Sequence, residues 1–248
     1  MSTNTKITEI TTDVYRISTF IGEANMQFNQ FLVVDDEPLL YHTGMNALYS
    51  SIKAAVSLVI NPSKIRWIGF SHFEADECGS LNQWLEDAPH AQAVCSLVGA
   101  LVSVNDFATR PALALEDGEQ FKTGNHRFRF CATPQVPHAW DAGMLFEENK
   151  EILFCSDILH QMGDVEPITE EPVIIERFRQ TLAGYNEGPF AHYLPYTSET
   201  GPTLEKLADL DPKILLPMHG SAFIGNGRQV LLDTAKMMRE TLSAAESV

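Results

Sequence analysis

The order of hydrophobic and polar positions predicts that the chain begins with strands. Residues 7–19 (ITEITTDVYRIST) alternate in polarity and are rich in β-branched side chains. Two further apolar runs, at 29–34 and 38–43, are separated by acidic residues next to a proline, which is typical of a hairpin turn. In residues 47–60 the apolar positions instead recur every three or four residues, which predicts a helix that ends at the following Asn-Pro pair.

The rest of the chain continues to alternate between short apolar runs and amphipathic runs. The apolar runs predict strands at 65–70, 91–96 and 213–220 and hairpins at 119–134 and 142–157, and helices are expected at 79–88, 97–104, 170–187, 203–210 and 228–245. Two strand-rich halves with helices outside indicate an α/β fold, a four-layer αββα sandwich that forms one domain over residues 1–248. In the last helix the side chains expected to face a sheet are Leu231, Leu232, Ala235 and Met238.

Composition and charge narrow the classes of function. The 248 residues are 44% hydrophobic and 20% charged, as in ordinary globular domains. A formal net charge of −16 repels nucleic-acid phosphates and anionic lipid, so neither nucleic acid nor a membrane is an expected partner. The sequence predicts no signal peptide and no membrane helix. We therefore expect a cytoplasmic protein with reduced thiols, in which Cys95 and Cys131 are buried strand residues.

Residues 71–80 (SHFEADECGS) place one imidazole and three carboxylates where the predicted strand 65–70 ends. His72, Glu74 and Asp76 alternate, so in an extended segment they would point the same way, and Glu77 follows directly. Such groups repel one another in a small volume unless a cation lies among them. Taken alone, the stretch is equally consistent with a solvated acidic loop in which a carboxylate interacts with a helix dipole.

Three distant positions favour the metal interpretation. His138, Asp157 and His219 each follow an apolar run that predicts a strand. Active sites of layered α/β folds gather at strand ends, so four strand ends that each supply a histidine or a carboxylate indicate one shared site. Other histidines are less informative: His90, His126 and His192 lie beside turns or helices without companion donors and are interpreted as surface or structural residues, and His42 and His160 are left open.

The donor set is too large for one tetrahedral metal. His72, Glu74, Asp76, His138, Asp157 and His219 make six ligands, with Glu77 as an optional seventh at the periphery of the pattern. Two metals that share a bridging carboxylate fit better, and Asp157 is the natural bridge by its position. Imidazoles and carboxylates without a thiolate suit iron, and also manganese.

These residues resemble a known family. The order H-x-[HE]-x-D, then His, then Asp, then a C-terminal His-Gly resembles the metallo-β-lactamase fold, and Glu74 at the second position resembles the flavodiiron proteins, which reduce oxygen or nitric oxide at a non-haem di-iron centre. Residues 26–37 and 203–220 resemble the same family. The resemblance implies two iron ions, one held by His72, Glu74 and His138, the other by Asp76 and His219, with Asp157 as the bridge.

The chain also departs from the flavodiiron pattern. Glu77 stands where those proteins have a histidine, and His42 stands where many members of the superfamily have an aspartate before Thr-Gly. No flavodoxin domain is expected after the di-metal domain, and therefore no bound FMN. The chain thus looks like the stand-alone oxygen-binding di-iron proteins, and an external flavoprotein or a rubredoxin-like protein would supply electrons.

The sequence therefore predicts a protein that binds, senses or reduces O2 or NO at two iron ions. Whether it turns over as an oxidoreductase is open, as is the oligomeric state, a homodimer included. The alternative is a hydrolase of the same fold with zinc or manganese, which Glu74 disfavours, and a third interpretation is a binding module without catalysis. Phe28, Phe73 and Trp140 are candidates for a dry pocket over the metals, with core packing as the alternative role of each.

Overall fold

The computed structural model describes residues 4–186 and 188–242 and contains two mixed seven-stranded sheets. The first sheet has the order β1 (Asn4–Thr11), β2 (Val14–Ile21), β3 (Met26–Val33), β4 (Leu39–Tyr41), β5 (Trp67–Gly69), β6 (Gln92–Ser96), β7 (Leu113–Leu115). The second has the order β12 (Ile168–Thr169), β14 (Ala222–Ile224), β13 (Ile214–Pro217), β11 (Ile152–Ser156), β10 (Gly143–Glu147), β9 (Arg127–Ala132), β8 (Gln120–Lys122).

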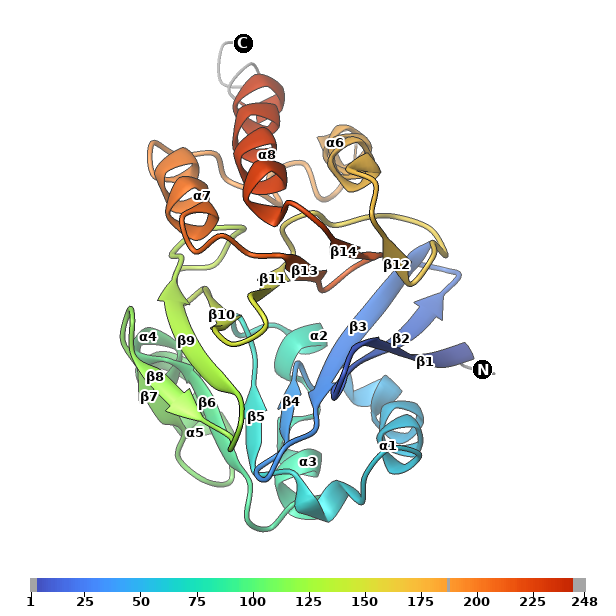
Figure 1. Cartoon of the computed structure of the whole chain (residues 1–248), viewed down its shortest axis with the longest axis vertical. Coiled ribbons are helices and arrows are strands. Elements are labelled where there is room, and N and C mark those ends of the chain that lie inside the picture. The colour runs from blue at the N-terminus through green and yellow to red at the C-terminus, as the bar shows by residue number, and fades with distance from the viewer. Residues whose placement is uncertain (1–3, 187, 243–248) are drawn as a thin grey trace.

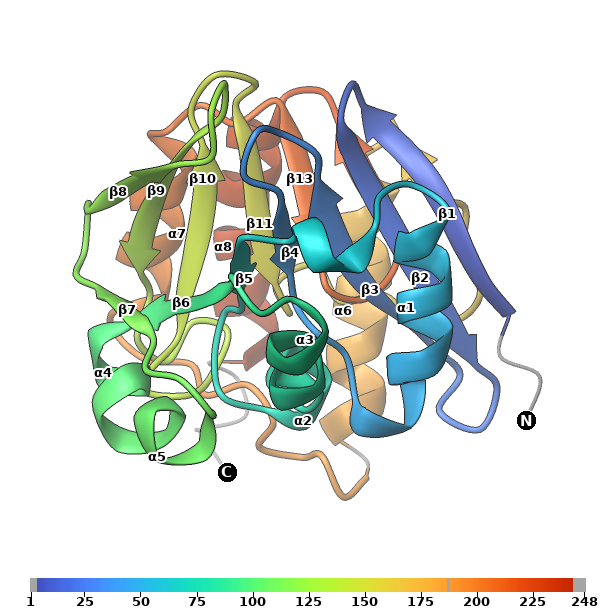
Figure 2. The same ribbon diagram turned by 90° about the horizontal axis from the view of Figure 1, so that it is seen from below.

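Helices cover the outer faces of both sheets (Figures 1 and 2). On the side of the first sheet lie α1 (Tyr49–Ser57), α2 (Ala75–Cys78), α3 (Leu81–Asp87), α4 (Leu97–Gly99), a π-turn (Ala100–Val104) and α5 (Asn105–Phe107), with short 3-10 turns at Asn46–Leu48 and Pro62–Lys64. The second sheet is covered by α6 (Val173–Asn186), α7 (Thr200–Ala208) and α8 (Gly227–Leu242). None of the helices in the described ranges is long and apolar enough to cross a membrane.

Three hydrophobic layers hold the four structural layers together. One lies under α6, α7 and α8, one lies between the first sheet and its helices, and the third fills the space between the sheets with side chains such as Phe31, Phe128 and Phe154. In α8, Leu231, Ala235 and Met238 are buried and Leu232 packs partly against the same core, as predicted. The αββα sandwich expected from the sequence is therefore confirmed.

The differences from the sequence prediction are local. Residues 7–19 form parts of two strands, because Asp13 takes a positive φ of 65° and turns the chain into a hairpin. The strands β7, β12 and β14 were not predicted, since two or three residues are too few to show alternation. The helical stretch from Leu97 extends to Phe107 instead of ending at residue 104. The predicted helix ends at 187 and 243–245 lie outside the described residues.

The strand directions bring four loops to one end of the sandwich. β11 and β13 are parallel, and β9 runs the same way as β11 because both are antiparallel to β10. The loops after β9, β11 and β13 therefore leave the second sheet at the same end, and the loop after β5 of the first sheet meets them: the amide of Gly143 donates to the carbonyl of Ser71 at 2.9 Å. This meeting point positions the candidate site.

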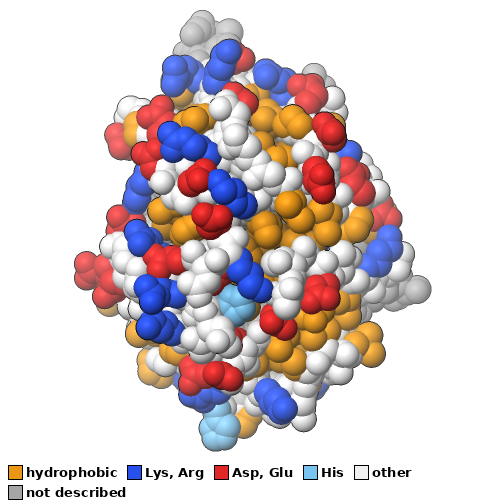
Figure 3. Space-filling model, viewed as in Figure 1, with side chains coloured by type: hydrophobic (Ala, Val, Ile, Leu, Met, Phe, Trp, Pro, Cys, Tyr) orange, Lys and Arg blue, Asp and Glu red, His pale blue; other side chains and the backbone are white. Residues whose placement is uncertain are grey.

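The opposite end of the sandwich is fastened by Asp35. Its carboxylate accepts hydrogen bonds from the amides of Asn125 and His126 at 3.1 and 2.9 Å and from the hydroxyl of Thr123 at 2.8 Å, which joins the β3–β4 turn to the β8–β9 turn. On the face of Figure 3, acidic and basic side chains are interspersed and form no large region of one sign. This face therefore offers no basic surface for a phosphate backbone.

Gly143 marks a close approach within the second sheet, and we expect Gly143→Ala to destabilise the fold. A Cβ at this position would clash with the ring edge of buried Phe130. Overpacking of this kind costs about 1–3 kcal/mol. Denaturant unfolding of the variant tests this, with Gly184→Ala as the matched control: Gly184 lies exposed on α6 with open space around it, so alanine should leave stability equal or raise it by up to about 1 kcal/mol. Equal stability of the two variants would contradict the packing.

Candidate metal centre

The loop after β5 delivers the first four side chains, but not in the extended conformation that the sequence suggested. Residues 71–74 form bends, and α2 starts at Ala75, so Glu74 is the last extended residue (φ −130°, ψ 166°) while Asp76 and Glu77 lie in the first helical turn. The side chains of this stretch therefore converge, but not because they alternate along an extended segment. A bend followed by a helix turn brings Asp76 and Glu77 toward the imidazole of His72.

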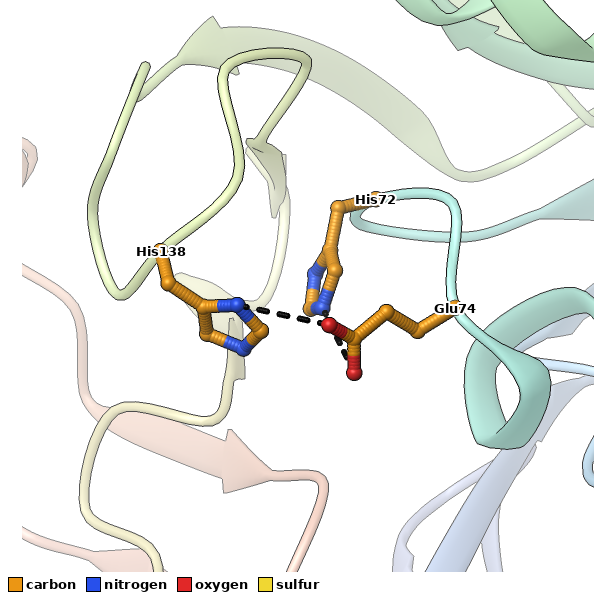
Figure 4. A group of neighbouring side chains, drawn as sticks. All are labelled: His72, Glu74 and His138. Atoms are coloured by element: carbon orange, nitrogen blue, oxygen red, sulfur yellow. Dashed lines mark ion pairs between the residues drawn. The ribbon is translucent and has the colours of Figure 1, made fainter. Parts of the chain in front are cut away.

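One group of side chains consists of His72, Glu74 and His138 (Figure 4). Glu74 reaches both imidazoles: its carboxylate oxygens lie 3.9 Å from Nε2 of His72 and 3.5 Å from Nδ1 of His138. His72 is buried in the loop after β5, and His138 comes from the loop after β9 in the other sheet. The group therefore spans the gap between the two sheets.

Asp157 lies between this group and a second one. Its Oδ2 is 3.0 Å from Nε2 of His138 and 3.6 Å from Nε2 of His72, whereas its Oδ1 is 3.1 Å from Nε2 of His219. Asp76 approaches the same nitrogen of His219 at 3.5 Å. The two oxygens of one carboxylate thus face two different sets of donors.

Glu77 is buried in the middle of the cluster, not at its periphery as the sequence pattern suggested. It is 1% exposed, and its Oε1 lies 3.8 Å from Nε2 of His72. Neither oxygen has a hydrogen-bond partner among the described residues. The same holds for Nε2 of His72. Buried polar atoms of this kind are normally paired, so this set of atoms fits a bound cation.

Hydrogen bonds on the far side of each ring orient the imidazoles. Nδ1 of His219 donates to the carbonyl of Gln27 at 2.9 Å, which leaves Nε2 facing Asp76 and Asp157. Nδ1 of His72 lies 3.0 Å from the hydroxyl of Ser71 and 3.3 Å from that of Ser156. Such outer contacts fix the ring orientation of metal-binding histidines.

Two histidines that the sequence left open adjoin the cluster. His42 is fully buried and its Nε2 lies 3.2 Å from the hydroxyl of Ser71, so it supports His72 from behind. His160 stacks on His219 with ring centres 4.3 Å apart and approaches the hydroxyl of Tyr185 at 3.3 Å. The only sequence signal for His160 is its position three residues after Asp157.

A cavity of about 470 Å³ opens over the cluster. Its lining includes Glu74, Asp76 and His219 together with Tyr185 and Tyr193. The three aromatic residues that the sequence suggested for a pocket over the metals do not line this cavity. Phe28 packs edge-on against His219 with ring centres 5.1 Å apart, outside the cavity lining, and Phe73 contacts Phe107 instead. Trp140 is 60% exposed and does not line this cavity, so its predicted place over the metals is wrong.

The charges of the cluster shift its proton affinities in opposite directions. Burial acts to raise the pKa of Asp157, but the imidazoles of His138 and His219 outweigh it and hold that pKa well below its usual range. Burial likewise acts to lower the pKa of His219, but Asp157 and Asp76 raise it to about 10. Glu77 has no imidazole partner of this strength, so burial, together with Asp76 and Asp157, raises its pKa well above the usual value.

The remaining histidines lie away from the cluster, as predicted. His90 and His192 are exposed. His126 is buried and does have a companion, contrary to the sequence interpretation, because its Nδ1 lies 3.1 Å from a carboxylate oxygen of Glu147. Its role is structural. All four cysteines are buried and free, and none is part of the cluster.

Comparison with known proteins gives consistent matches. The family model described as ODP family beta lactamase matches residues 26–220. The rubredoxin-oxygen oxidoreductase of Megalodesulfovibrio gigas is 23% identical over 80% of this chain and 49% of its own length, and a flavo-diiron protein of Clostridium acetobutylicum is 21% identical over 90% of this chain and 55% of its own. The chain thus spans about half the length of these curated relatives.

The fold agrees with solved structures of the same kind. A mutant of the flavo di-iron protein from Thermotoga maritima superimposes with a TM-score of 0.78 at 21% identity, over 95% of this chain and 61% of that one. The rubredoxin oxygen:oxidoreductase from Desulfovibrio gigas superimposes with a TM-score of 0.76 at 19% identity, over 93% of this chain and 62% of that one. The metallo-β-lactamase-like sandwich expected from the sequence is confirmed.

The burial of Glu77 predicts how the metal-free protein responds to pH. Its folded-state pKa is raised, so the folded state binds more protons than the unfolded state and the free energy of unfolding falls as pH rises above about 4.5. Glu77 can contribute up to about 1.4 kcal/mol per pH unit to this decrease, and we expect Glu77→Gln to abolish that contribution. Denaturant unfolding of chelator-treated protein between pH 5 and 8 measures it. The control is Glu205→Gln at an exposed position of α7, and identical pH slopes in both variants would show that Glu77 is not a buried carboxylate.

Proposed function

The chain belongs to the ODP beta lactamase family, and from this membership and the geometry of its ionisable cluster we propose that it binds, senses or reduces O2 or nitric oxide at a pair of iron ions bridged by a carboxylate. The observation that carries the proposal is the position of Asp157. Its Oδ2 faces His72 and His138, and its Oδ1 faces His219. A single carboxylate whose oxygens face two donor sets is the arrangement that a two-metal bridge requires.

The donors fit two iron ions. In this proposal His72, Glu74 and His138 hold one ion, and Asp76 and His219 hold the other. Asp157 bridges the two ions, and Glu77 is a further donor next to His72. Three imidazoles and four carboxylates without a thiolate suit iron. The unpartnered buried atoms of His72 and Glu77 support the presence of cations, because uncompensated buried charges would be costly.

Bound in the ferrous state, two such ions would supply electrons and open coordination positions to a diatomic ligand. The chain's own residues provide the enclosure. Tyr185 and Tyr193 line the cavity, and the hydroxyl of Tyr185 approaches His160. Phe28 and His160 contact the ring of His219 from two directions and restrict its movement. A small apolar ligand such as O2 or NO would enter through the aromatic cavity.

We propose further that electrons come from a separate protein, a flavoprotein or a rubredoxin-like carrier. One relative is named a rubredoxin-oxygen oxidoreductase, which supports this class of donor. That the domain works without its own FMN, and in the cytoplasm, remains a prediction from the sequence. The hydrolase alternative has no comparable support, since Glu74 lowers the imidazole content of the site.

Metal content tests the proposal directly. Protein expressed with ample iron should contain two irons per chain, because each oxygen of Asp157 faces its own donor set. Elemental analysis at full occupancy measures this. One metal per chain, or zinc selected over available iron, would refute the assignment and favour the hydrolase alternative.

Two substitutions separate the bridge from its neighbour. Asp157→Ala should lose both metals, whereas Glu77→Ala should lose at most one, because the closest imidazole contact of Glu77 is on the His72 side only. Asp117→Ala, which removes an exposed carboxylate paired with Lys206, serves as the control and should keep both metals. Equal metal loss in the Asp157 and Glu77 variants would argue against the bridge.

The reaction with oxygen distinguishes binding from turnover. Reduced, iron-loaded protein should react with O2 in one round, seen as the rise of ferric absorbance, and then stop until an electron donor is added. Stopped-flow spectra and an oxygen electrode measure the two parts. Rapid sustained consumption with a generic flavoprotein donor would make reductase the function. Absence of any reaction with O2 or NO, together with esterase or lactamase activity, would move the protein to the hydrolases.

A further inference from the structure

Exposed apolar side chains gather in one region of the surface. Of the nine large hydrophobic side chains that are exposed among the described residues, six belong to the helical stretch from α4 to α5 or to the loop after β9: Leu97, Val98, Leu101, Val102, Phe107 and Trp140. Leu101 is 73% exposed and Trp140 is 60% exposed. We refer to these six residues as the α4–α5 patch. Contiguous exposed apolar surface of this kind is typical of an interaction site.

The patch is continuous across the two segments. A cavity of about 300 Å³ lies between them, lined by Leu97 and Val98 from the helical stretch and by Pro134 and Trp140 from the loop. Leu101 and Val102 follow Leu97 and Val98 by one helical turn, so they extend the same surface. Figure 2 shows α4 and α5 together at one corner of the molecule, beside α2 and α3. A partner could insert a side chain into the cavity and cover the turn next to it.

The patch lies next to the candidate metal centre. The loop after β9 places His138 in the cluster and Trp140, two residues later, on the surface. Asp141 accepts a hydrogen bond from the amide of Phe73 at 3.0 Å, and Phe73 lies between His72 and Glu74 in the chain. The ring of Phe73 in turn contacts Phe107 with centres 5.4 Å apart. Two short routes therefore lead from the patch to the cluster: one runs along the chain from Trp140 to His138, and the other passes through the ring contact between Phe107 and Phe73.

The charge around the patch is acidic. Residues 96–119 carry four carboxylates, at Asp106, Glu116, Asp117 and Glu119, against one basic side chain, Arg110. Lys206 of α7 pairs with Asp117 at 2.6 Å, which leaves Asp106, Glu116 and Glu119 as the acidic side chains of the rim. The guanidinium of Arg110 donates to the backbone carbonyls of Leu85, Ala88 and Ala91, so it is directed to the backbone and not to these carboxylates. An apolar centre with an acidic rim is complementary to an apolar centre with a basic rim.

We propose that the α4–α5 patch is the docking surface for the electron donor, a small one-electron carrier protein with an apolar centre and a basic rim. The inference rests on the proposed function, which requires such a donor. In each encounter one electron leaves the reduced centre of the carrier and enters the site, so the carrier is oxidised and the site is reduced by one electron, with no transfer of atoms. Small, transient interfaces with charged rims are typical of electron-transfer complexes.

A second copy of the chain fits this surface less well. The acidic rims of two copies would face each other, and each chain has a net charge of −16. Like charges across an interface are strongly unfavourable. The charge of the rim thus favours a basic partner over self-association.

The test uses a small basic c-type cytochrome as the probe and measures its dissociation constant by calorimetry at low salt. We expect Trp140→Ala and Leu101→Ala each to weaken binding by about tenfold, since buried aromatic and apolar anchors dominate interfaces and neither change alters the charge. The matched control is Leu58→Ala, an 81% exposed leucine after α1 and outside the patch, which should leave binding unchanged. Raising the salt concentration should weaken binding of every variant.

The outcomes are distinct. No binding of the basic probe, or equal affinity for all three variants, would overturn the proposal, because attraction would then be absent or not specific to the patch. A wild-type dimer in sedimentation that Leu101→Ala or Trp140→Ala dissociates would also overturn it and assign the surface to a second copy. The binding measurement is repeated on metal-free protein, so that it does not depend on the metal centre. If binding depends on the patch but the iron-loaded protein does not react with O2 or NO, the proposed function is refuted and the docking surface is still supported.

Discussion

The carboxylate of Asp157 contacts the imidazoles of His138 and His219 at about the same distance from its two oxygens, and the rest of the site is arranged around this contact. Asp157 is buried beside Glu77, whose oxygens have no hydrogen-bond partner among the described residues. The protein itself offsets this negative charge only in part. The raised pKa values of His72 and His219 favour their protonated, positive forms, and the raised pKa of Glu77 favours its neutral form. Positive charge from metal ions is the natural complement, since buried unpaired carboxylates are strongly unfavourable.

Backbone hydrogen bonds between the loops of different strands fix the segments of this cluster relative to one another. The amide of Met218 donates to the carbonyl of Ser156 at 2.7 Å, and the amide of Gln161 donates to that of His219 at 3.1 Å. The amide of Asn29 donates to the carbonyl of Met218 at 2.9 Å, which ties the first sheet to the same loop. The segments that carry Asp157 and His219 are therefore tied to each other and to the first sheet, which favours the preorganised geometry that precise metal binding requires.

The loop after β9 connects the interior of the site to its surroundings. It carries His138 inward and Trp140 outward, and Asp141 fixes it to the amide of Phe73. A partner that binds at Trp140 would therefore contact a loop that carries His138 and is hydrogen-bonded to Phe73, the residue after His72. The aromatic cavity over Asp76 and His219 is lined by a different set of residues, so ligand entry and partner contact can occupy separate surfaces.

The sequence by itself determined the layers and most of the donor positions. Apolar runs of five or six residues and amphipathic helices such as α8 reflect local periodicity, and they located His72, His138, Asp157 and His219 because each follows such a run. Only the tertiary structure decided which groups meet. The burial of Glu77, the stacking of His160 on His219 and the exposure of Trp140 depend on how loops from two sheets pack together, and contacts between residues far apart in the chain leave no local pattern. Short strands such as β12 and β14 escaped prediction for the same reason, since pairing with a neighbour and not intrinsic alternation makes them strands.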